Sequence, residues 1–223
     1  MYEADVMFEK TGTGMIAQAE GAQVLNLSSG EMTTREDGGA YVMKRFELHR
    51  AIAEADGVVS LAVTKTHACS DVTLCMKSIF GALPERKKSK YHTKLDHVIA
   101  DISTFLKPRL NIVDATVGLE GYGPFEGEQV KLDLLIAGDN IVATDACAAA
   151  IMGFEPSTIP HLKLTSERGT GPVDLTDIEV RGERLEDVRR EFKKAPKKRE
   201  TESCAESPPP SGTTPCTATT HQP

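Results

Sequence analysis

The chain has no tryptophan, and aromatic residues make up only 5% of its 223 residues. No apolar run approaches the ~18 residues of a transmembrane helix, and no signal peptide opens the chain, so neither a membrane span nor secretion is predicted. Acidic residues are in excess, with Lys+Arg 26 against Asp+Glu 33, which argues against a general nucleic-acid binder. What remains is a chain long enough for one domain with a core of its own.

The five cysteines show no C-x-x-C spacing, which excludes a zinc ribbon and leaves the chain without a cysteine-rich iron–sulfur motif. Their odd number and the length of the chain argue against a disulfide scaffold. We therefore expect a reducing, cytoplasmic setting.

The C-terminal segment differs in composition from the rest. Six of the twelve prolines lie at or after Pro196, where no aliphatic pattern remains. Such a segment buries too little apolar surface to offset its ordering entropy, so residues 195–223 are expected to be disordered. Residues 1–194 are expected to form a single α/β domain.

Apolar runs alternate with helical patterns along this body. Strands are predicted at 22–27, 58–63, 110–113, 132–137 and 178–180. Helices are predicted up to Gly21 and at 48–55, from 70 or 71 to Gly81, and at 92–105, 141–152 and 185–192. Alternation of this kind predicts a mostly parallel sheet with helices on both faces.

Polar residues follow three of these strands. Lys65 and His67 end the first, Asp114 ends the second, and Asp139 follows the third, with Asp145 one turn into the next helix. Ligands bind beyond the carboxyl ends of strands in open parallel sheets, so these residues are expected to share one rim.

Lys65 and His67 come directly after an apolar run, where neither can stay in the core unpaired. Anion binding by Lys65 and acid–base or metal chemistry by His67 is one interpretation, and a solvated strand end is the other. Lys77, on an otherwise apolar helix, favours the first. His92 ends the basic run 85–92, which is either a solvated loop or an electropositive lid over an anionic substrate.

The segment Glu120–Gly127 is the densest glycine cluster. Gly121, Gly123 and Gly127 would let backbone N–H groups approach a ligand, and a plain turn between strands is the alternative. The first interpretation is favoured because Asp114 and Glu120 flank the segment. Neither a Walker A loop nor a dinucleotide fingerprint is present. Asp114 and Glu120 flank the cluster, and with the histidines they would suit a divalent metal, without a diagnostic spacing.

These motifs together resemble a family. KTHACSDVTLCMKSIFGALP, KYH, IVDATVGLEGYGPFEG and AGDNIVATDACAAAIMG are similar in order and spacing to the bacterial and archaeal family named domain of unknown function 362. The resemblance runs from about Ile52 to Gly171. It implies an α/β domain that is often joined to ferredoxin-like four-iron, four-sulfur modules.

The family's characteristic positions fall on Lys65, His67, Thr73, Lys77, Gly81, His92, Asp114, Glu120, Gly121, Gly123, Pro124, Gly127, Asp139 and Asp145. Two departures matter. The cluster-binding cysteines are absent, and so is an earlier strand with its Lys-Pro-Asn type motif, which predicts an N-terminally truncated member. A truncated domain should leave an exposed sheet edge or an apolar patch larger than a few hundred Å², and should dimerise through that surface or be poorly soluble.

The leading hypothesis is an enzyme-like domain that acts on a small anionic metabolite, metal-assisted or redox-linked. Lys65, His67 and His92 would be catalytic; Lys77, Thr73 and the three glycines would bind substrate; Asp114 and Glu120 would bind metal. One alternative is a non-catalytic electron-transfer or maturation partner of an iron–sulfur protein. Another is an inactive fragment. Whether the chain is an enzyme stays open at this point.

Overall fold

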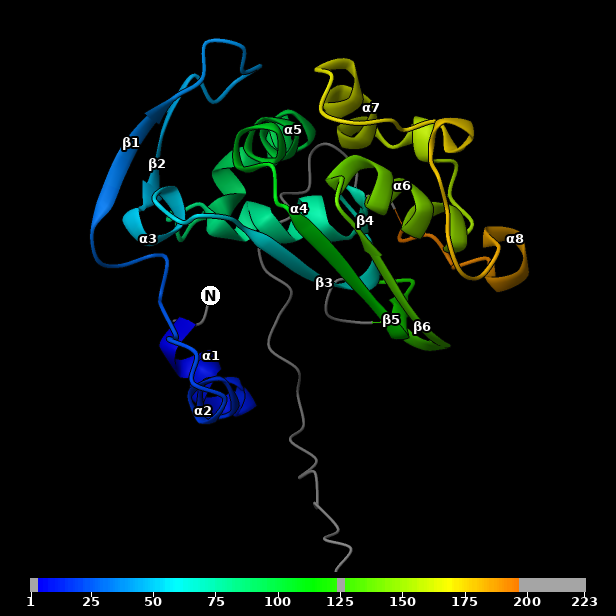
Figure 1. Ribbon diagram of the computed structural model, residues 1–223, viewed down its shortest axis with the longest axis horizontal. Coiled ribbons are helices and arrows are strands. Elements are labelled where there is room, and N and C mark those ends of the chain that lie inside the picture. Colours follow the sequence, from blue (N-terminus) through cyan, green and yellow to red (C-terminus); the bar gives the residue numbers. More distant parts are fainter. Residues whose placement is uncertain (1–3, 124–126, 197–223) are drawn as a thin grey trace, which may run out of the picture.

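The computed structural model of the protein describes residues 4–123 and 127–196. The segment expected to be disordered, 195–223, lies almost entirely outside these ranges, and so does part of the glycine-rich turn. The described residues form two sheets and a set of helices gathered on one side of the larger sheet (Figure 1).

The main sheet has four strands in the order β4-β3-β5-β6. Their bounds are β3 Val59–His67, β4 Asp71–Thr73, β5 Leu110–Glu120 and β6 Glu128–Gly138. Only β3 and β5 run parallel; β3–β4 and β5–β6 are antiparallel. The prediction of a mostly parallel sheet was therefore wrong. The cause is the short connections at 68–70 and 121–127, since a parallel return needs a crossover of about a dozen residues or more.

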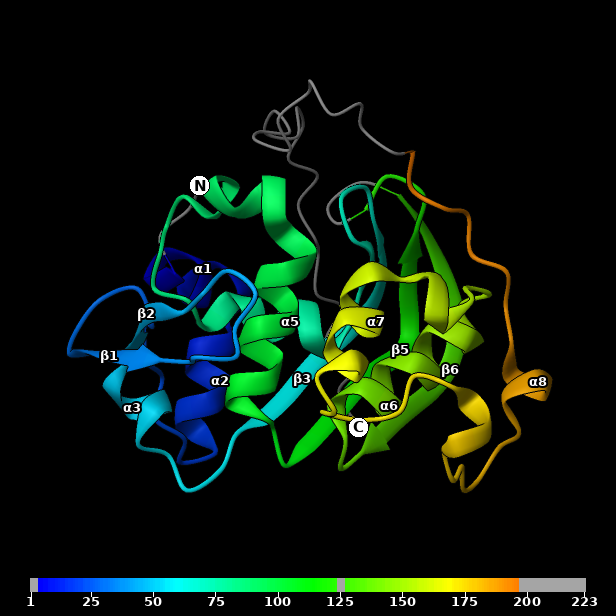
Figure 2. The same ribbon diagram turned by 90° about the horizontal axis from the view of Figure 1, so that it is seen from above.

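Four helices pack on one face of this sheet: α4 Cys75–Ile79, α5 Leu95–Leu106, α6 Ile141–Ile151 and α7 Pro160–Glu167. Figure 2 shows them from the helical side. The Asn140 side chain caps α6 by accepting from the backbone N–H groups of Val142 and Ala143 at 3.0 and 3.1 Å. The largest fully buried side chains of this core include Met76, Ile99 and Leu162.

Among the described residues, no helix covers the opposite face of the sheet, contrary to the prediction. Its outward apolar residues, here called the bare face, are Val59, Leu61, Val63, Leu110, Ile112, Leu135 and Ala137. Asp114 lies on the same face between Val63 and Leu135. Exposed positions alternate along β3 with buried ones, as in a sheet covered on one side only. Exposed apolar side chains therefore lie on this sheet face, and the truncation from which such exposure was expected stays a prediction.

The N-terminal part forms a separate layer. It consists of α1 Ala4–Thr11, α2 Thr13–Ala19, the antiparallel strands β1 Met32–Glu36 and β2 Arg45–His49, and α3 Arg50–Ala53. No strand forms at the predicted 22–27. The helix predicted at 48–55 is shorter, because its first two residues belong to β2.

Short 3-10 turns and a last helix complete the fold. The 3-10 segments are Phe80–Ala82, Lys88–Lys94, Pro156–Thr158 and Leu175–Asp177, and α8 is Leu185–Val188. The strand predicted at 178–180 is absent, and the helix predicted at 185–192 is reduced to α8. Backbone bonds from Arg190 to Ile151 and from Phe192 to Met152 dock this extended arm onto the end of α6.

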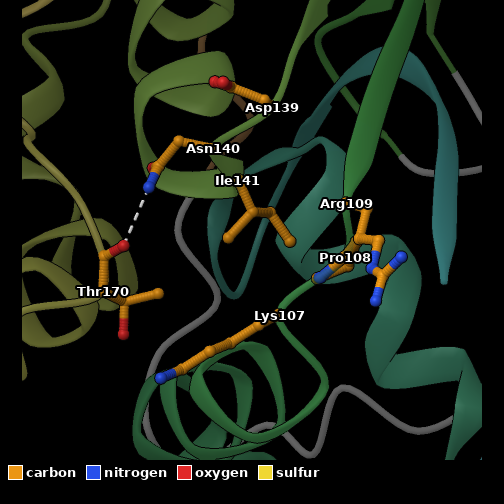
Figure 3. Close-up of a pocket in the computed structure, with 7 residues that line it drawn as sticks. All are labelled: Lys107, Pro108, Arg109, Asp139, Asn140, Ile141 and Thr170. Atoms are coloured by element: carbon orange, nitrogen blue, oxygen red, sulfur yellow. Dashed lines mark hydrogen bonds between the residues drawn. The ribbon is translucent and has the colours of Figure 1, made fainter. Parts of the chain in front are cut away.

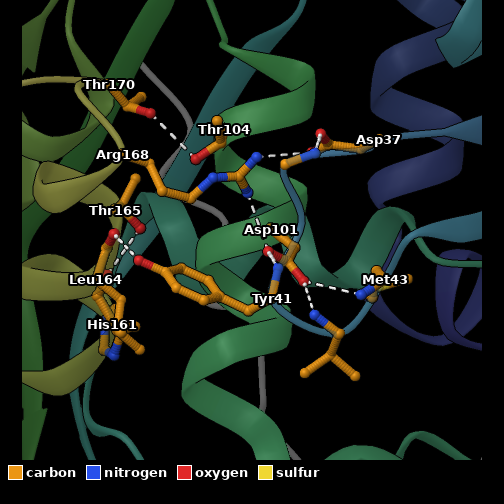
Figure 4. A network of polar contacts seen from close by, with 12 residues as sticks. Asp37, Tyr41, Met43, Asp101, Thr104, His161, Leu164, Thr165, Arg168 and Thr170 are labelled. Carbon is orange, nitrogen blue, oxygen red and sulfur yellow. Dashed lines mark hydrogen bonds and ion pairs between the residues drawn. The ribbon is translucent and has the colours of Figure 1, made fainter.

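Asp101 of α5 joins the N-terminal layer to the helices (Figure 4). Its buried carboxylate accepts from the backbone N–H groups of Tyr41, Val42 and Met43 at 2.8, 2.9 and 2.9 Å. Arg168, at the end of α7, donates to Asp101 at 2.9 Å and to Asp37 at 2.8 Å. The loop between β1 and β2 is thereby fixed against α5 and α7.

Candidate functional site

The predicted rim is divided between the two ends of the sheet. Because β6 runs antiparallel to β5, Gly138 pairs with Asn111 at the start of β5. Asp139 therefore lies at the end of the sheet opposite to His67, which ends β3. The expectation that three strand ends share one rim was wrong, and the reversed direction of β6 is the reason.

Asp114 and Glu120 have separate partners. Asp114 accepts from the backbone N–H and the hydroxyl of Thr116 at 2.9 and 2.7 Å, and these bonds lower its pKa. Glu120 is buried and accepts from the backbone N–H of Lys193 at 2.8 Å.

The two carboxylates also lie far apart along the sheet. Asp114 pairs with Leu135 and Glu120 with Glu128, which puts roughly 20 Å of strand between them. One ion could not contact both. Among the described residues, no group of three or more His, Cys, Asp or Glu side chains is placed to hold a metal ion. A metal role for either carboxylate stays a prediction.

Each of the three glycines has a conformational or packing explanation. Gly121 adopts φ 82, a left-handed conformation. A Cβ at Gly123 would stand 1.9 Å from the Thr66 carbonyl oxygen, and one at Gly127 would stand 2.2 Å from that of Glu120. The close approach of the turn to β3 and to the end of β5 thus requires glycine. Ligand contacts by these residues stay a prediction.

Cations gather around one aromatic ring at the start of the helical layer. Lys77 of α4 places its Nζ 4.6 Å from the centroid of the Phe80 ring, and Lys88 places its own at 5.5 Å. The Lys88 ammonium also donates to the Phe80 and Gly81 carbonyls at 3.3 and 2.7 Å. The Tyr91 ring meets Phe80 edge-on, with centroids 5.8 Å apart.

Both lysines are perturbed by burial. Burial lowers the pKa of Lys77 to about 8, and burial followed by the charge of Lys77 lowers the pKa of Lys88 to about 8. In the described part of the chain, neither ammonium forms an ion pair with a carboxylate. We call Lys77, Lys88, His67 and His92 the cationic cluster.

His67 lies within the electrostatic influence of the other members. Burial, followed by the charges of Lys77, His92 and His161, lowers its pKa to about 4, so the imidazole is neutral at pH 7. Its Nδ1 accepts from the backbone N–H of Cys69 at 3.0 Å. The proton of the neutral ring is therefore on Nε2, which makes His67 a hydrogen-bond donor to a ligand.

Lys65 and Thr73 face each other across the β3–β4 ladder. By strand alternation Lys65 lies on the same side of β3 as Val63, at the edge of the bare face. The Thr73 hydroxyl is buried without a hydrogen-bond partner among the described residues. The roles of these two residues toward a ligand stay predictions.

Two carboxylates support the site, Asp145 fully buried and Asp96 half-buried. Asp145 accepts from the backbone N–H groups of Cys75 and Met76 at 2.9 and 2.8 Å and so fixes the start of α4. Burial nevertheless raises its pKa to about 6. Asp96 of α5 contacts Nδ1 of the buried His161 at 3.0 Å.

Sequence reasoning missed Lys88, which lay inside the basic run, and also missed the pair of Asp96 and His161, which no local pattern marks.

A pocket of about 320 Å³ lies at the other end of the sheet, beside the start of α6 (Figure 3). It is lined by Lys107, Pro108, Arg109, Asp139, Asn140, Ile141 and Thr170. Asn140 is held there by α6 and by a 2.8 Å bond from its side-chain amide to the Thr170 carbonyl. Apart from Asp139, none of the residues singled out in the sequence lines this pocket.

The class of protein is thus an α/β domain with a one-sided four-stranded sheet and a lysine-rich cluster beside it. The chain belongs to the family described as domain of unknown function (DUF362), whose model matches residues 2–150. The resemblance drawn from the sequence motifs is therefore confirmed.

A relative from Synechocystis sp. (strain ATCC 27184 / PCC 6803 / Kazusa) is called Thylakoid-associated protein sll1697. It is 25% identical over 171 residues, which cover 74% of this chain and 52% of the relative. The chain thus spans about half the length of that protein. No solved structure is similar enough to count as a match. No helix in the described ranges is long and apolar enough to cross a membrane.

Proposed function

We propose that the cationic cluster binds a small anionic molecule, a carboxylate or a phosphate monoester, and that Lys77 exchanges a proton with it. The observation that carries this proposal is the placement of two half-buried ammonium groups around one ring without a contacting carboxylate among the described residues. A buried charge is costly unless it is paired, and an anionic ligand would supply the missing partner.

Hydrogen bonding favours a division of roles. Both lysines have a pKa of about 8, but Lys88 is held by two carbonyl oxygens, which fix its position and favour its charged form. Lys77, with a pKa of about 8, holds its proton loosely near neutral pH and suits general acid–base chemistry. Neutral His67 donates from Nε2, so it would orient the ligand through a hydrogen bond rather than through charge.

The test is calorimetric titration with inorganic phosphate, and separately with acetate, at pH 7 and constant ionic strength. We expect saturable binding that weakens at least tenfold in Lys77→Met and in Lys88→Met. The exposed Lys163 gives the matched control, Lys163→Met, which should bind as the wild type does.

Proton uptake gives a second readout. An anion that stabilises the Lys77 ammonium raises its pKa, so binding at pH 8 should take up protons. That uptake appears as a dependence of the heat on the buffer and should shrink in Lys77→Met. If neither probe binds, or if all four proteins bind equally, the proposal is wrong.

Metal assistance, redox-linked chemistry and a ferredoxin-like partner rest on the sequence and on the family resemblance, and they stay predictions. So does a cytoplasmic location, since the relative's name places that protein at thylakoids.

A further inference from the structure

The bare face is a mainly apolar surface on three adjacent strands, interrupted by the carboxylate of Asp114 between Val63 and Leu135. Leu61, Ile112 and Ala137 form one row across β3, β5 and β6, and Val59 pairs with Leu110 in the next. Val59, Leu61 and Leu135 are 60%, 66% and 66% exposed. Apolar patches of a few hundred Å² on soluble proteins are often interaction surfaces.

A second unpartnered surface lies on the same side of the molecule. The hairpin of α1 and α2 lies on the side of β3 away from α4 and α5 (Figure 1). Neither of its helices contains a buried residue. Met15 and Ile16 of α2 are 74% and 66% exposed.

Helices this short need tertiary contacts. Isolated helices of fewer than about 12 residues are marginal in water, and most helix stability in proteins comes from packing an apolar face. Within the described ranges, nothing buries a face of the hairpin. The bare face is likewise a sheet surface of the kind that helices cover in α/β domains.

We propose that the occupant of the bare face is a second copy of this chain, whose α1–α2 hairpin packs over it, reciprocally about a two-fold axis. An isologous dimer of this kind covers both surfaces of both copies at once. It also adds the missing helical layer to each sheet.

The area agrees with this assignment. The bare face offers on the order of 300 Å² of apolar side chain, taking roughly 100 Å² for a fully exposed aliphatic side chain. With the hairpin surface added, two reciprocal contacts bury on the order of 1,000 Å² of apolar area in total. That amount suits the apolar share of a standard interface of about 1,200–2,000 Å².

The test is sedimentation equilibrium of the full chain at micromolar concentration. We expect a dimer for the wild type. We expect monomers for the sheet-face variant Leu61→Lys/Leu135→Lys and for the hairpin variant Met15→Glu/Ile16→Glu. All of these positions are exposed in the monomer, so far-ultraviolet circular dichroism should be unchanged. Val180→Lys, at an exposed apolar position outside both surfaces, should leave the dimer intact.

Mixing the two monomeric variants distinguishes this interface from others. The wild-type hairpin of the sheet-face variant can still cover the wild-type sheet of the hairpin variant, so one of the two contacts returns and a weaker dimer should form. Three results would overturn the proposal. The first is a monomeric wild type, which is expected if the hairpin folds onto its own sheet. The others are a dimer that survives either double substitution and a mixture of the two variants that does not associate.

Discussion

Replacing Asp101 by alanine should be among the most destabilising single changes in this protein. The Asp101 carboxylate is 1% exposed and is the only side-chain partner among the described residues for the three successive backbone N–H groups of the β1–β2 loop. It also pairs with Arg168. The substitution would leave these donors without an acceptor in a place that water reaches poorly.

The magnitude follows from the bonds. A buried donor left unsatisfied costs about 1–3 kcal/mol, and breaking a buried ion pair costs about 3–5 kcal/mol. These effects overlap, so we expect Asp101→Ala to lower the free energy of unfolding by about 4–6 kcal/mol. Asp101→Asn retains one carbonyl oxygen and should cost less, about 2–3 kcal/mol.

The assay is urea unfolding followed by circular dichroism, with thermal melting as a second measurement. For a chain of this size the alanine variant should melt about 10–20 °C lower. Glu179→Ala, which removes a carboxylate from a fully exposed ion pair, should change the free energy by less than about 0.5 kcal/mol. A loss below about 1.5 kcal/mol for Asp101→Ala would refute the assignment of Asp101 as the residue that fixes this loop.

Two other predictions concern the turn and the cationic cluster. Gly123→Ala should cost about 2–3 kcal/mol, because its Cβ would meet the Thr66 carbonyl, whereas Gly81→Ala, with open space around it, should be close to neutral in the same urea titration. Lys77 has a folded pKa of about 8 against the ordinary lysine value of 10.5, so the folded protein binds fewer protons than the unfolded chain between these values. Stability from this group should therefore rise as the pH rises from about 8 to 10.5. Lys77→Met should reduce that slope, and an unchanged slope in denaturation curves across this range would contradict the burial of the ammonium.

Several elements could be predicted because their signals are local. The helical repeat of Leu95 to Phe105 and the Ala-rich run after Asn140 correspond to α5 and α6. The apolar runs at 58–63, 110–113 and 132–137 lie in β3, β5 and β6. Each of these segments has a periodicity and a start or stop residue within its own few residues. The family could be recognised for a similar reason, because its motifs are short strings in a specific order.

Strand direction and the site's composition depended on contacts distant in sequence. The runs at 110–113 and 132–137 look alike whether the strands are parallel or antiparallel, and only the hairpin at 121–127 placed Asp139 at the far end of the sheet. Lys77 and Lys88 become a pair only because both reach the Phe80 ring. The charge of one then adds to the effect of burial on the pKa of the other.

The sequence by itself therefore determined which segments form strands and helices, the family, and the residue types available for chemistry. Tertiary structure decided which of those residues meet and which sheet face is left uncovered. The physical reason is that periodicity records how a segment divides its own side chains between core and solvent. Pairing direction and burial depend instead on the segment that lies opposite. Asp101 illustrates the difference, since its three amide partners come from a loop about sixty residues earlier, and nothing near Asp101 in the sequence indicates them.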